Sequence, residues 1–243
     1  MPRFKWGATP APKYRYLVYG VPGVGKTTLS EYLPGRVFML SLDNSFQRVN
    51  RWQGSEDIWS IDPKTPIEDL QEFAIEFNPA EYDWLVIDNL SNLQKLWFVE
   101  KANETSNHLD NKLQHYGEFT NWIIRFISKM FSYDINILVT CWEGDFDVTE
   151  ANGQSFQQHA PDLRASARDY LMGNCDVVGR MVVNPKTGGH GLVLEGDIGT
   201  YAKNRLDNRK GCEASELFTS GLFTVRVSEE SRAESTAGAG QAE

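Results

Sequence analysis

The segment from Gly20 to Thr27, GVPGVGKT, constrains the fold more than any other part of the sequence. It matches the phosphate-binding pattern G-x-x-x-x-G-K-[ST]. The four fixed positions are Gly20, Gly25, Lys26 and Thr27. Such a loop works between a buried strand and a helix, because backbone N–H groups and the helix N-terminus together surround the phosphate oxygens. The aromatic and β-branched residues 14–19 favour a strand before the loop, and residues 27–33 favour a short helix that Pro34 and Gly35 end.

The pattern assigns an expected role to each part of the loop. Lys26 should reach the terminal phosphates of a nucleoside triphosphate, and the Thr27 hydroxyl should bind Mg²⁺. The remaining contacts should come from backbone N–H groups of the loop. We therefore expect ATP and Mg²⁺ as the bound groups. The residues expected to hold the nucleotide are Gly20, Val21, Pro22, Gly23, Val24, Gly25, Lys26, Thr27 and Thr28.

Strand-like and helix-like segments alternate after the loop, which predicts right-handed β-α-β units on a mostly parallel sheet. Apolar runs predict further strands at 36–42, 82–90 and 135–143. Helical periodicity predicts one helix from 65 to 77, with a capping box at Thr65 and Glu68, and another with a wide apolar face from 119 to 131. A β-hairpin is expected from 176–183 and 192–196. The sequence therefore predicts an α/β fold with a C-terminal hairpin extension.

An aspartate ends the apolar run WLVID, at Asp88. Ligands of open α/β sheets bind beyond the carboxyl ends of the strands, and Mg²⁺ prefers oxygen ligands. A hydrophobic strand that ends in Asp is common by itself. Because it follows a phosphate-binding loop here, we expect Asp88 to hold Mg²⁺ together with Thr27, directly or through water.

Hydrolysis also needs a group that orients or deprotonates the attacking water. Asp43, Glu143 and, more remotely, Asp145 follow predicted strands near the expected site. Asp43 is the preferred candidate, because the strand it leaves carries the catalytic carboxylate in one large class of P-loop ATPases. Thr140 and Glu143 could instead sense the γ-phosphate. The alternative for each acid is a simple polar strand end.

Two cations late in the chain, Lys203 and Arg205, form the third feature. They are two residues apart, so on an extended segment both should point to the same side. One interpretation is a solvated basic edge that discourages strand pairing. The functional interpretation is a pair of fingers that reach the γ-phosphate held by a neighbouring subunit, where positive charge stabilises phosphoryl transfer.

Composition limits the remaining possibilities. The 243 residues, of which 41% are hydrophobic, suit one sizeable α/β domain, expected over 14–227. Residues 1–13 read as a flexible basic arm, and 228–243 as a disordered acidic tail. The net charge of −9 argues against coating nucleic acid by bulk electrostatics. No signal peptide or membrane-spanning run is recognisable, so we expect a cytoplasmic protein with no membrane partner.

Taken together, these segments resemble the phage-encoded RecA-like P-loop ATPases, a group that includes phage nucleotide-binding AAA domains and single-strand-annealing recombinases. The resemblance spans about residues 14–215. Its motifs are the loop at 20–27, LVIDNL, ILVTCWE, PDLRASARDYLMGNCDVVGRM and the late KNR. KNR also matches the finger motif of related hexameric helicases and of the RadA branch.

The resemblance implies an ASCE-type sheet, in which the P-loop strand lies next to the 135–143 strand. It also implies ATP hydrolysis, subunits stacked in rings or filaments, and single-stranded DNA bound along their inner face. A single-strand DNA-binding protein is a further candidate partner, and the host cytoplasm is the expected location. The alternative is a P-loop kinase or nucleotide-dependent regulator that does not bind DNA.

The segment 143–159 lacks the positive charge that is expected of a segment that contacts DNA. It should form a hairpin about Asn152 and Gly153 near the expected DNA path, yet it is acidic and no Lys or Arg follows it before Arg164. DNA affinity should therefore be modest and salt-sensitive. Phe146 and Phe156 could stack on bases, although core packing is the commoner role of such residues. The candidate phosphate contacts, which surface solubility explains equally well, are Arg164, Arg168, Arg180 and Lys186.

Overall fold

A central sheet organises the chain in the computed structural model, which describes residues 12–105, 112–149 and 153–219. Its strands are β1 (Arg15–Gly20), β2 (Val37–Ser41), β3 (Ile58–Ser60), β4 (Trp84–Asp88), β5 (Asn136–Thr149), β6 (Ser155–Pro161), β7 (Val177–Val183), β8 (His190–Val193), β9 (Lys203–Asn204) and β10 (Gly211–Glu213). The sheet order is β10-β8-β7-β1-β5-β4-β2-β3, with β6 beside β5 and β9 beside β7. Residues 1–11 of the arm predicted over 1–13, and the tail predicted over 228–243, lie outside the described residues.

The strand neighbours confirm the predicted fold class. The path β7-β1-β5-β4-β2-β3 is parallel throughout, whereas β8, β6, β9 and β10 pair antiparallel with their neighbours. The P-loop strand β1 lies directly beside β5, and β5 separates it from β4. The predicted C-terminal hairpin is present as β7 and β8. The architecture is an α/β fold with a mostly parallel sheet, in which the P-loop strand lies beside β5 as the resemblance to RecA-like ATPases implies.

Alternating side chains of the central strands serve two separate cores. Leu17 and Tyr19 of β1 pack on one face of the sheet, while Tyr16 and Val18 pack on the other. All four are buried. Strands covered on both faces read as nearly continuous apolar runs, which explains why these segments were recognisable in the sequence.

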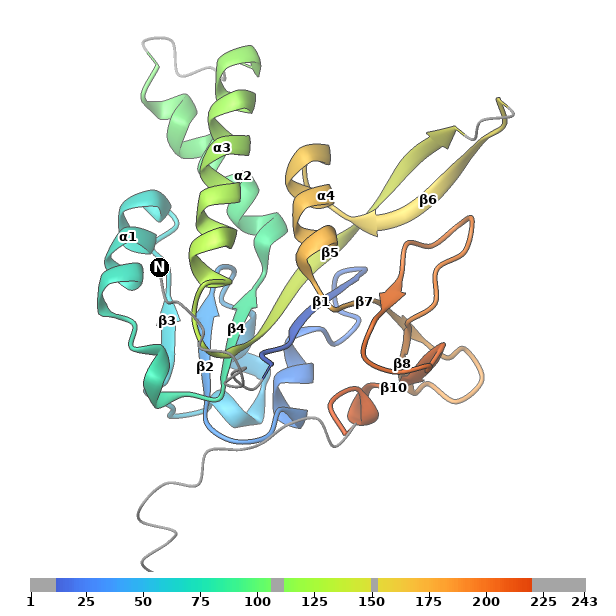
Figure 1. The fold of residues 1–243 in the computed structure, drawn as a ribbon. Helices are drawn as coiled ribbons and strands as arrows, with labels where there is room; N and C mark the ends of the chain where they lie inside the picture. Colours follow the sequence, from blue (N-terminus) through green and yellow to red (C-terminus); the bar gives the residue numbers. More distant parts are fainter. Residues whose placement is uncertain (1–11, 106–111, 150–152, 220–243) are drawn as a thin grey trace, which may run out of the picture.

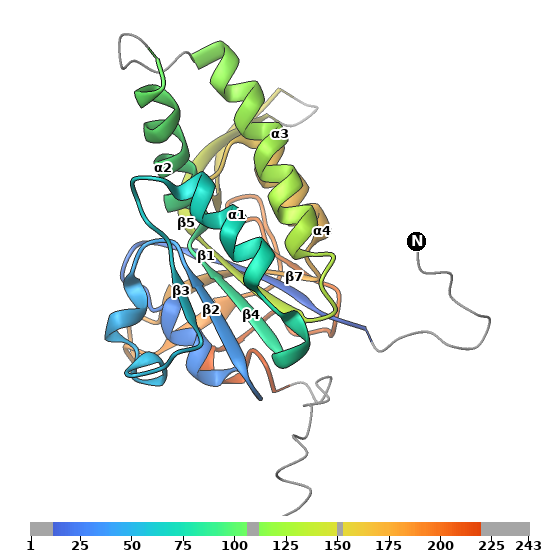
Figure 2. The same ribbon diagram turned by 90° about the vertical axis from the view of Figure 1, so that its left-hand side faces the viewer.

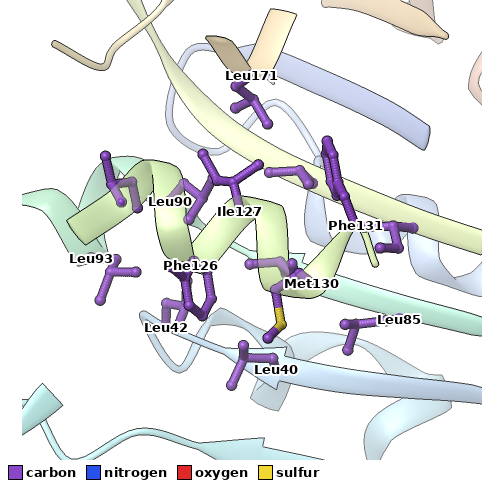
Figure 3. Close-up of a cluster of buried hydrophobic side chains, with 14 of the residues drawn as sticks. Leu40, Leu42, Leu85, Leu90, Leu93, Phe126, Ile127, Met130, Phe131 and Leu171 are labelled. Atoms are coloured by element: carbon purple, nitrogen blue, oxygen red, sulfur yellow. The ribbon is translucent and has the colours of Figure 1, made fainter. Parts of the chain in front are cut away.

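Four α-helices cover the first face, as the turned view in Figure 2 shows. They are α1 (Pro66–Glu76), α2 (Leu90–Asn103), α3 (Lys112–Met130) and α4 (Ala165–Asn174). In Figure 3, Phe126, Ile127 and Met130 of α3 lie between leucines from the sheet and from α2 and α4. The predicted apolar face of this helix is therefore the centre of the larger core.

The second face is covered by short 3₁₀-helices instead. They are η1 (Thr27–Tyr32), η2 (Ser45–Arg48), η3 (Asn50–Trp52) and η5 (Ala214–Glu216), while η4 (Pro79–Glu81) follows α1. Buried Leu29 and Trp52 hold η1 and η3 to the sheet. The helix predicted after the P-loop is thus a six-residue 3₁₀-helix, a form that proteins use in short pieces. It ends before Pro34, as the sequence indicated.

The start of α1 corrects a sequence expectation. Thr65 is its N-cap residue but makes no side-chain capping bond. The backbone N–H of Ile67 instead donates to Glu100 of α2 at 3.1 Å. A carboxylate from a neighbouring helix therefore replaces the predicted capping box, a contact that local spacing cannot predict.

The outer half of β5 leaves the body of the sheet and pairs with β6 as a two-stranded arm (Figure 1). This confirms the predicted hairpin, although its turn at 150–152 lies outside the described residues. Gly153 has a φ of +86°, which favours glycine at the end of the turn. Over the described part of the chain, no helix has both the length and the hydrophobicity that crossing a membrane requires.

Candidate functional site

The loop between β1 and η1 has the backbone that its glycines permit. Gly23 and Gly25 have φ values of +81° and +97°, in the region that side chains disfavour. A Cβ on Gly20 would lie 2.8 Å from the carbonyl oxygen of Met181, so no larger residue fits there. These constraints hold the loop open at the carboxyl end of β1, above the parallel strands.

A hollow of about 380 Å³ lies against this loop. The loop residues that line it are Pro22, Gly23, Gly25, Lys26, Thr27 and Thr28. The other lining residues include Asp43, Ser45, Asp88, Asn89 and Trp142. Of the remaining predicted nucleotide contacts, Val21 is half exposed and Val24 packs into the second core, so neither side chain lines the hollow.

Lys26 is turned back onto its own loop. Its ammonium donates to the carbonyl oxygens of Gly20 at 2.8 Å and Val21 at 3.0 Å, and the residue is only 7% exposed. Burial lowers the pKa of this ammonium, while the negative charge of Asp88 acts in the opposite direction. Because an ammonium carries three N–H donors, one remains for a phosphate oxygen.

Asp88 is the centre of an oxygen-rich cluster. One carboxylate oxygen accepts hydrogen bonds from the hydroxyls of Thr27 and Ser45, both at 2.7 Å, and the other accepts from Thr140. The Thr27 and Ser45 oxygens are themselves 2.8 Å apart. The structure thus brings together the two predicted Mg²⁺ ligands, and it adds Ser45, which the sequence analysis missed.

This donor set fits Mg²⁺ in its chemistry. Mg²⁺ prefers one or two carboxylates together with phosphate and water oxygens, and Asp88 with two hydroxyls at the P-loop supplies the protein part. Among the described residues, no group of three or more His, Cys, Asp or Glu side chains could hold a metal. A metal at this site would therefore be held by the Asp88 carboxylate together with hydroxyl, phosphate and water oxygens.

Asp43 lies in the same hollow and is held in place from two sides. Its carboxylate accepts hydrogen bonds from the Asn89 amide at 2.9 Å and from the backbone N–H of Ser45 at 3.0 Å. Burial raises the pKa of the Asp43 carboxyl, and the nearby charge of Asp88 raises it further. A raised pKa favours a general base, which agrees with the preference for Asp43 over the other acids.

Comparison with known proteins agrees with this geometry. Residues 12–206 match the family model described as AAA domain. The chain belongs to the AAA domain family. It is therefore a nucleotide-binding P-loop ATPase. Among solved structures, the chain resembles flagellar accessory protein FlaH from Methanocaldococcus jannaschii at 15% identity and a TM-score of 0.42, over 82% of this chain and 83% of that chain. No curated protein matches the sequence.

Glu143 of the AAA domain is placed outside the lining of the hollow. Both of its carboxylate oxygens accept from the Arg180 guanidinium, at 2.8 and 2.9 Å, so β5 and β7 are tied together by a bidentate pair. Asp145, further along the arm, is 2.6 Å from Nδ1 of His159. Of the candidates on β5, Thr140 is the one that contacts Asp88. A role for Glu143 in catalysis stays a prediction.

Lys203 and Arg205 have different surroundings, in contrast to the expectation from their spacing. The Lys203 ammonium donates to the carbonyl oxygen of Met172 at 2.5 Å and lies 3.4 Å from that of Gly173, so it caps the C-terminal end of α4. Arg205 is exposed. The extended segment that would align them, β9, ends at Asn204.

Both cations lie near the amino end of the sheet. β9 pairs with β7 at Val177 and Val178, and the Arg205 N–H donates to the carbonyl of Asp176. In the sheet register Val177 is level with Tyr16, four residues before the end of β1 at Gly20. Arg205 lies one position further from the P-loop, beside Asp176, so at about 3.3 Å per residue its backbone is roughly 16 Å from the level of the P-loop. Arg205 is not among the residues that line the phosphate hollow of the same chain.

Three of the four cations considered as DNA phosphate contacts have partners within the chain. Arg180 pairs with Glu143. Arg164 and Arg168, near the start of α4, lie over the rings of Tyr116 and Phe146 at 3.6 and 3.8 Å. Lys186 is exposed in the β7–β8 turn. A guanidinium therefore covers one face of Phe146, one of the two candidates for stacking on a base.

Proposed function

We propose that this AAA domain hydrolyses ATP in a Mg²⁺-dependent reaction. The observation that carries the proposal is the contact of Thr27, Ser45 and Asp88 beside the P-loop lysine. When bound, Mg²⁺ would neutralise charge on the β- and γ-phosphates. Thr27, Ser45 and Asp88 would hold it, and Lys26 would contact a phosphate oxygen. Asp43, fixed by Asn89, would orient and deprotonate the attacking water.

We further propose that the active form is a homo-oligomer, a ring or a filament, acting on single-stranded DNA in phage recombination or replication. This part rests on the resemblance of the sequence to phage RecA-like ATPases. It is also supported by the position of Arg205, which suits a phosphate held by an adjacent subunit better than its own. A single-strand DNA-binding protein would be a natural partner on the same strand.

The decisive measurement is the rate of ATP hydrolysis with and without Mg²⁺ and single-stranded DNA, at low salt. We expect hydrolysis to require Mg²⁺ and to rise when single-stranded DNA is added, with duplex DNA as the comparison. Lys26→Ala is the control, because it removes the phosphate contact and should abolish hydrolysis in a folded protein. Unchanged turnover in that variant would overturn the P-loop assignment.

DNA binding itself gives an independent readout. If a few cations neutralise DNA phosphates, log affinity should fall linearly with log salt concentration, with a shallow slope. ATP hydrolysis without any DNA binding at low salt, with or without a non-hydrolysable ATP analogue, would contradict the DNA part. The alternative, a P-loop kinase or nucleotide-dependent regulator, would then be favoured.

A further inference from the structure

Arg48 is a second cation in the lining of the phosphate hollow, besides Lys26. It is the last residue of η2, the 3₁₀-helix that follows β2, and it is exposed. Within the described part of the chain, its guanidinium has no hydrogen-bond or ion-pair partner. Arg51, three residues further on, donates instead to three backbone carbonyl oxygens. The N–H donors of Arg48 are therefore available to a ligand in the hollow.

The start of η2 is joined directly to the expected metal site. Ser41, the last residue of β2, pairs with Asp88 of β4, so the chain leaves β2 at the level of Asp88. Ser45 opens η2, and its hydroxyl donates to Asp88 at 2.7 Å. The Ser45 oxygen also lies 2.8 Å from the hydroxyl oxygen of Thr27. The first residue of η2 thus belongs to the oxygen cluster that would hold Mg²⁺.

Helical geometry turns Arg48 toward the same cluster. Side chains three residues apart eclipse one another in a 3₁₀-helix. Ser45 and Arg48 are the first and last residues of η2 and are three residues apart, so they project from the same face. At about 2.0 Å per residue, their backbones are roughly 6 Å apart along the helix axis. The guanidinium therefore faces the hollow that Ser45 borders, in agreement with its place in the lining.

Contacts at both ends of η2 hold the backbone of Arg48 in place. At the start, the Ser45 hydroxyl is bound to Asp88. Directly after η2, Val49 is buried in the second core, and its N–H donates to the carbonyl oxygen of Phe46 at 2.9 Å. Only the exposed side chain remains to adjust, so the guanidinium can meet a bound phosphate without a movement of the surrounding loop.

A terminal phosphate in this hollow needs more donors than Lys26 supplies. Two of the three N–H donors of Lys26 bind carbonyl oxygens of its own loop. The carboxylates of Asp43 and Asp88 line the same hollow and repel phosphate. An arginine offers a planar fork of N–H donors that can bind two phosphate oxygens at once. Arg48 supplies both the missing donors and a compensating positive charge.

We propose that Arg48 binds the terminal phosphate of the nucleotide held by its own P-loop and stabilises the charge that develops during phosphoryl transfer. The inference rests on the proposed function, because it takes ATP to be the bound nucleotide. Arg48 approaches the phosphate from the side of β2, next to Asp43 and Ser45. Its role differs from the one expected of Arg205, which would act on the nucleotide of an adjacent subunit.

The guanidinium makes and breaks no covalent bond in this reaction. Water attacks the γ-phosphorus, and its proton passes to Asp43. The bond from the γ-phosphorus to the bridging oxygen breaks, and its electron pair leaves with ADP. Arg48 donates hydrogen bonds to the γ-phosphate oxygens, where preorganised donors lower the barrier of the step.

The first test compares the affinities for ADP and for a non-hydrolysable ATP analogue, both with Mg²⁺, by isothermal titration calorimetry. Arg48→Ala should weaken binding of the analogue about tenfold, because a charged hydrogen bond to phosphate is lost, and should leave ADP binding unchanged. Arg48→Lys should recover part of the loss, since the charge remains but the planar fork does not. Arg125→Ala, which removes an exposed arginine of α3 outside the lining, is the matched control and should bind both ligands normally.

The second test measures single-turnover hydrolysis at saturating ATP. Arg48→Ala should slow hydrolysis by about 10² or more, because a donor to the reacting phosphate is lost. A mixture of Arg48→Ala with Lys26→Ala should stay as slow, because both residues belong to the site of one subunit. Circular dichroism verifies that each variant is folded.

The outcomes separate the inference from the proposed function. Loss of affinity for the ATP analogue alone, together with slow hydrolysis in Arg48→Ala, supports the inference. Unchanged hydrolysis in that variant, equal loss of ADP and analogue binding, or activity restored by mixing overturns it while the proposed function stands. If the unmodified protein binds neither ligand, the P-loop assignment fails and the inference fails with it.

Discussion

Asp43 and Glu143 were both considered for the attacking water, and their surroundings now distinguish them. Asp43 lies in the phosphate hollow and is held by two donors that leave its carboxylate facing the same space as Asp88. Glu143 lies outside that lining, with both oxygens bound to Arg180. For these two residues, the hydrogen-bond partners rather than the residue type decide which carboxylate is free to act on the attacking water.

We therefore predict that Asp43→Asn lowers single-turnover ATP hydrolysis by about 10² or more while ATP affinity is retained, because general-base catalysis is lost. Glu143→Gln should instead destabilise the protein by about 2 kcal/mol, since it breaks a charged pair between β5 and β7. Hydrolysis kinetics and urea unfolding of both variants check this. Normal hydrolysis in Asp43→Asn, together with an inactive but stable Glu143→Gln, would reverse the assignment.

The individual residues differ in how far the sequence could reveal them. Lys26, Thr27 and Asp88 follow from a loop motif and a strand end, which are local patterns. Ser45 and Asn89 act through contacts across 43 and 46 residues, with Asp88 and Asp43 respectively. Their only local signal is a position shortly after a strand and within two residues of a candidate acid, Asp43 for Ser45 and Asp88 for Asn89. Contacts of this kind depend on how the sheet brings strand ends together.

At the scale of elements, β9 and α4 show how a spacing rule can fail. Lys203 and Arg205 would share a side only on a continuous strand, but β9 contains two residues. Lys203 turns toward the carbonyl end of α4, where a cation interacts favourably with the helix dipole. The sequence contained the cation and the helix, but only the fold put them in contact.

We predict that Lys203→Ala lowers the free energy of unfolding by about 1 kcal/mol, because the last carbonyls of α4 lose their donor. Arg205→Ala should change it by less than about 0.5 kcal/mol, since the side chain is exposed. Urea unfolding followed by circular dichroism measures both. Equal stability of the two variants would show that the Lys203 contact contributes nothing.

The elements themselves were largely predictable, because buried strands and amphipathic helices have strong periodic signals. The central strands, the helix of 66–76 and the hairpins at 143–161 and 177–193 appear close to the expected positions. The sequence analysis did not predict α2, α4 or β3, and its other failures occur at ends and caps. Thr65 does not cap α1, and the segment after the P-loop forms a 3₁₀-helix. Short elements are decided by tertiary packing, which for η1 is the burial of Leu29.

At the scale of the whole molecule, the position of Arg205 bears on assembly. Arg205 lies at the amino end of the sheet and the P-loop at the carboxyl end of β1, so one subunit cannot place both at the same phosphate. If Arg205 contributes to hydrolysis, it does so on the nucleotide of a neighbouring subunit. Such a finger acting in trans contributes about 10³-fold or more to the rate.

We predict that Arg205→Ala binds ATP but loses most hydrolysis, and that mixing it with Lys26→Ala restores activity. In mixed oligomers, some interfaces pair the intact P-loop of one variant with the intact arginine of the other. ATP hydrolysis by the mixture, with co-assembly verified by size-exclusion chromatography, measures this. An inactive mixture of co-assembled subunits would return Arg205 to an ordinary exposed cation.

The position of Trp142 offers a way to follow the phosphate hollow by tryptophan fluorescence. It is the one tryptophan, among the described residues, that lines the phosphate hollow, and the Lys95 ammonium lies 4.2 Å from the centre of its ring. Trp52, Trp84 and Trp97 are all buried elsewhere in the protein. The fluorescence of an indole depends on the charge and the water content of its surroundings, and the Trp142 indole lies beside both the Lys95 ammonium and the phosphate hollow. We therefore expect the fluorescence of Trp142 to change when a nucleotide occupies the hollow, so that binding can be followed without an added dye.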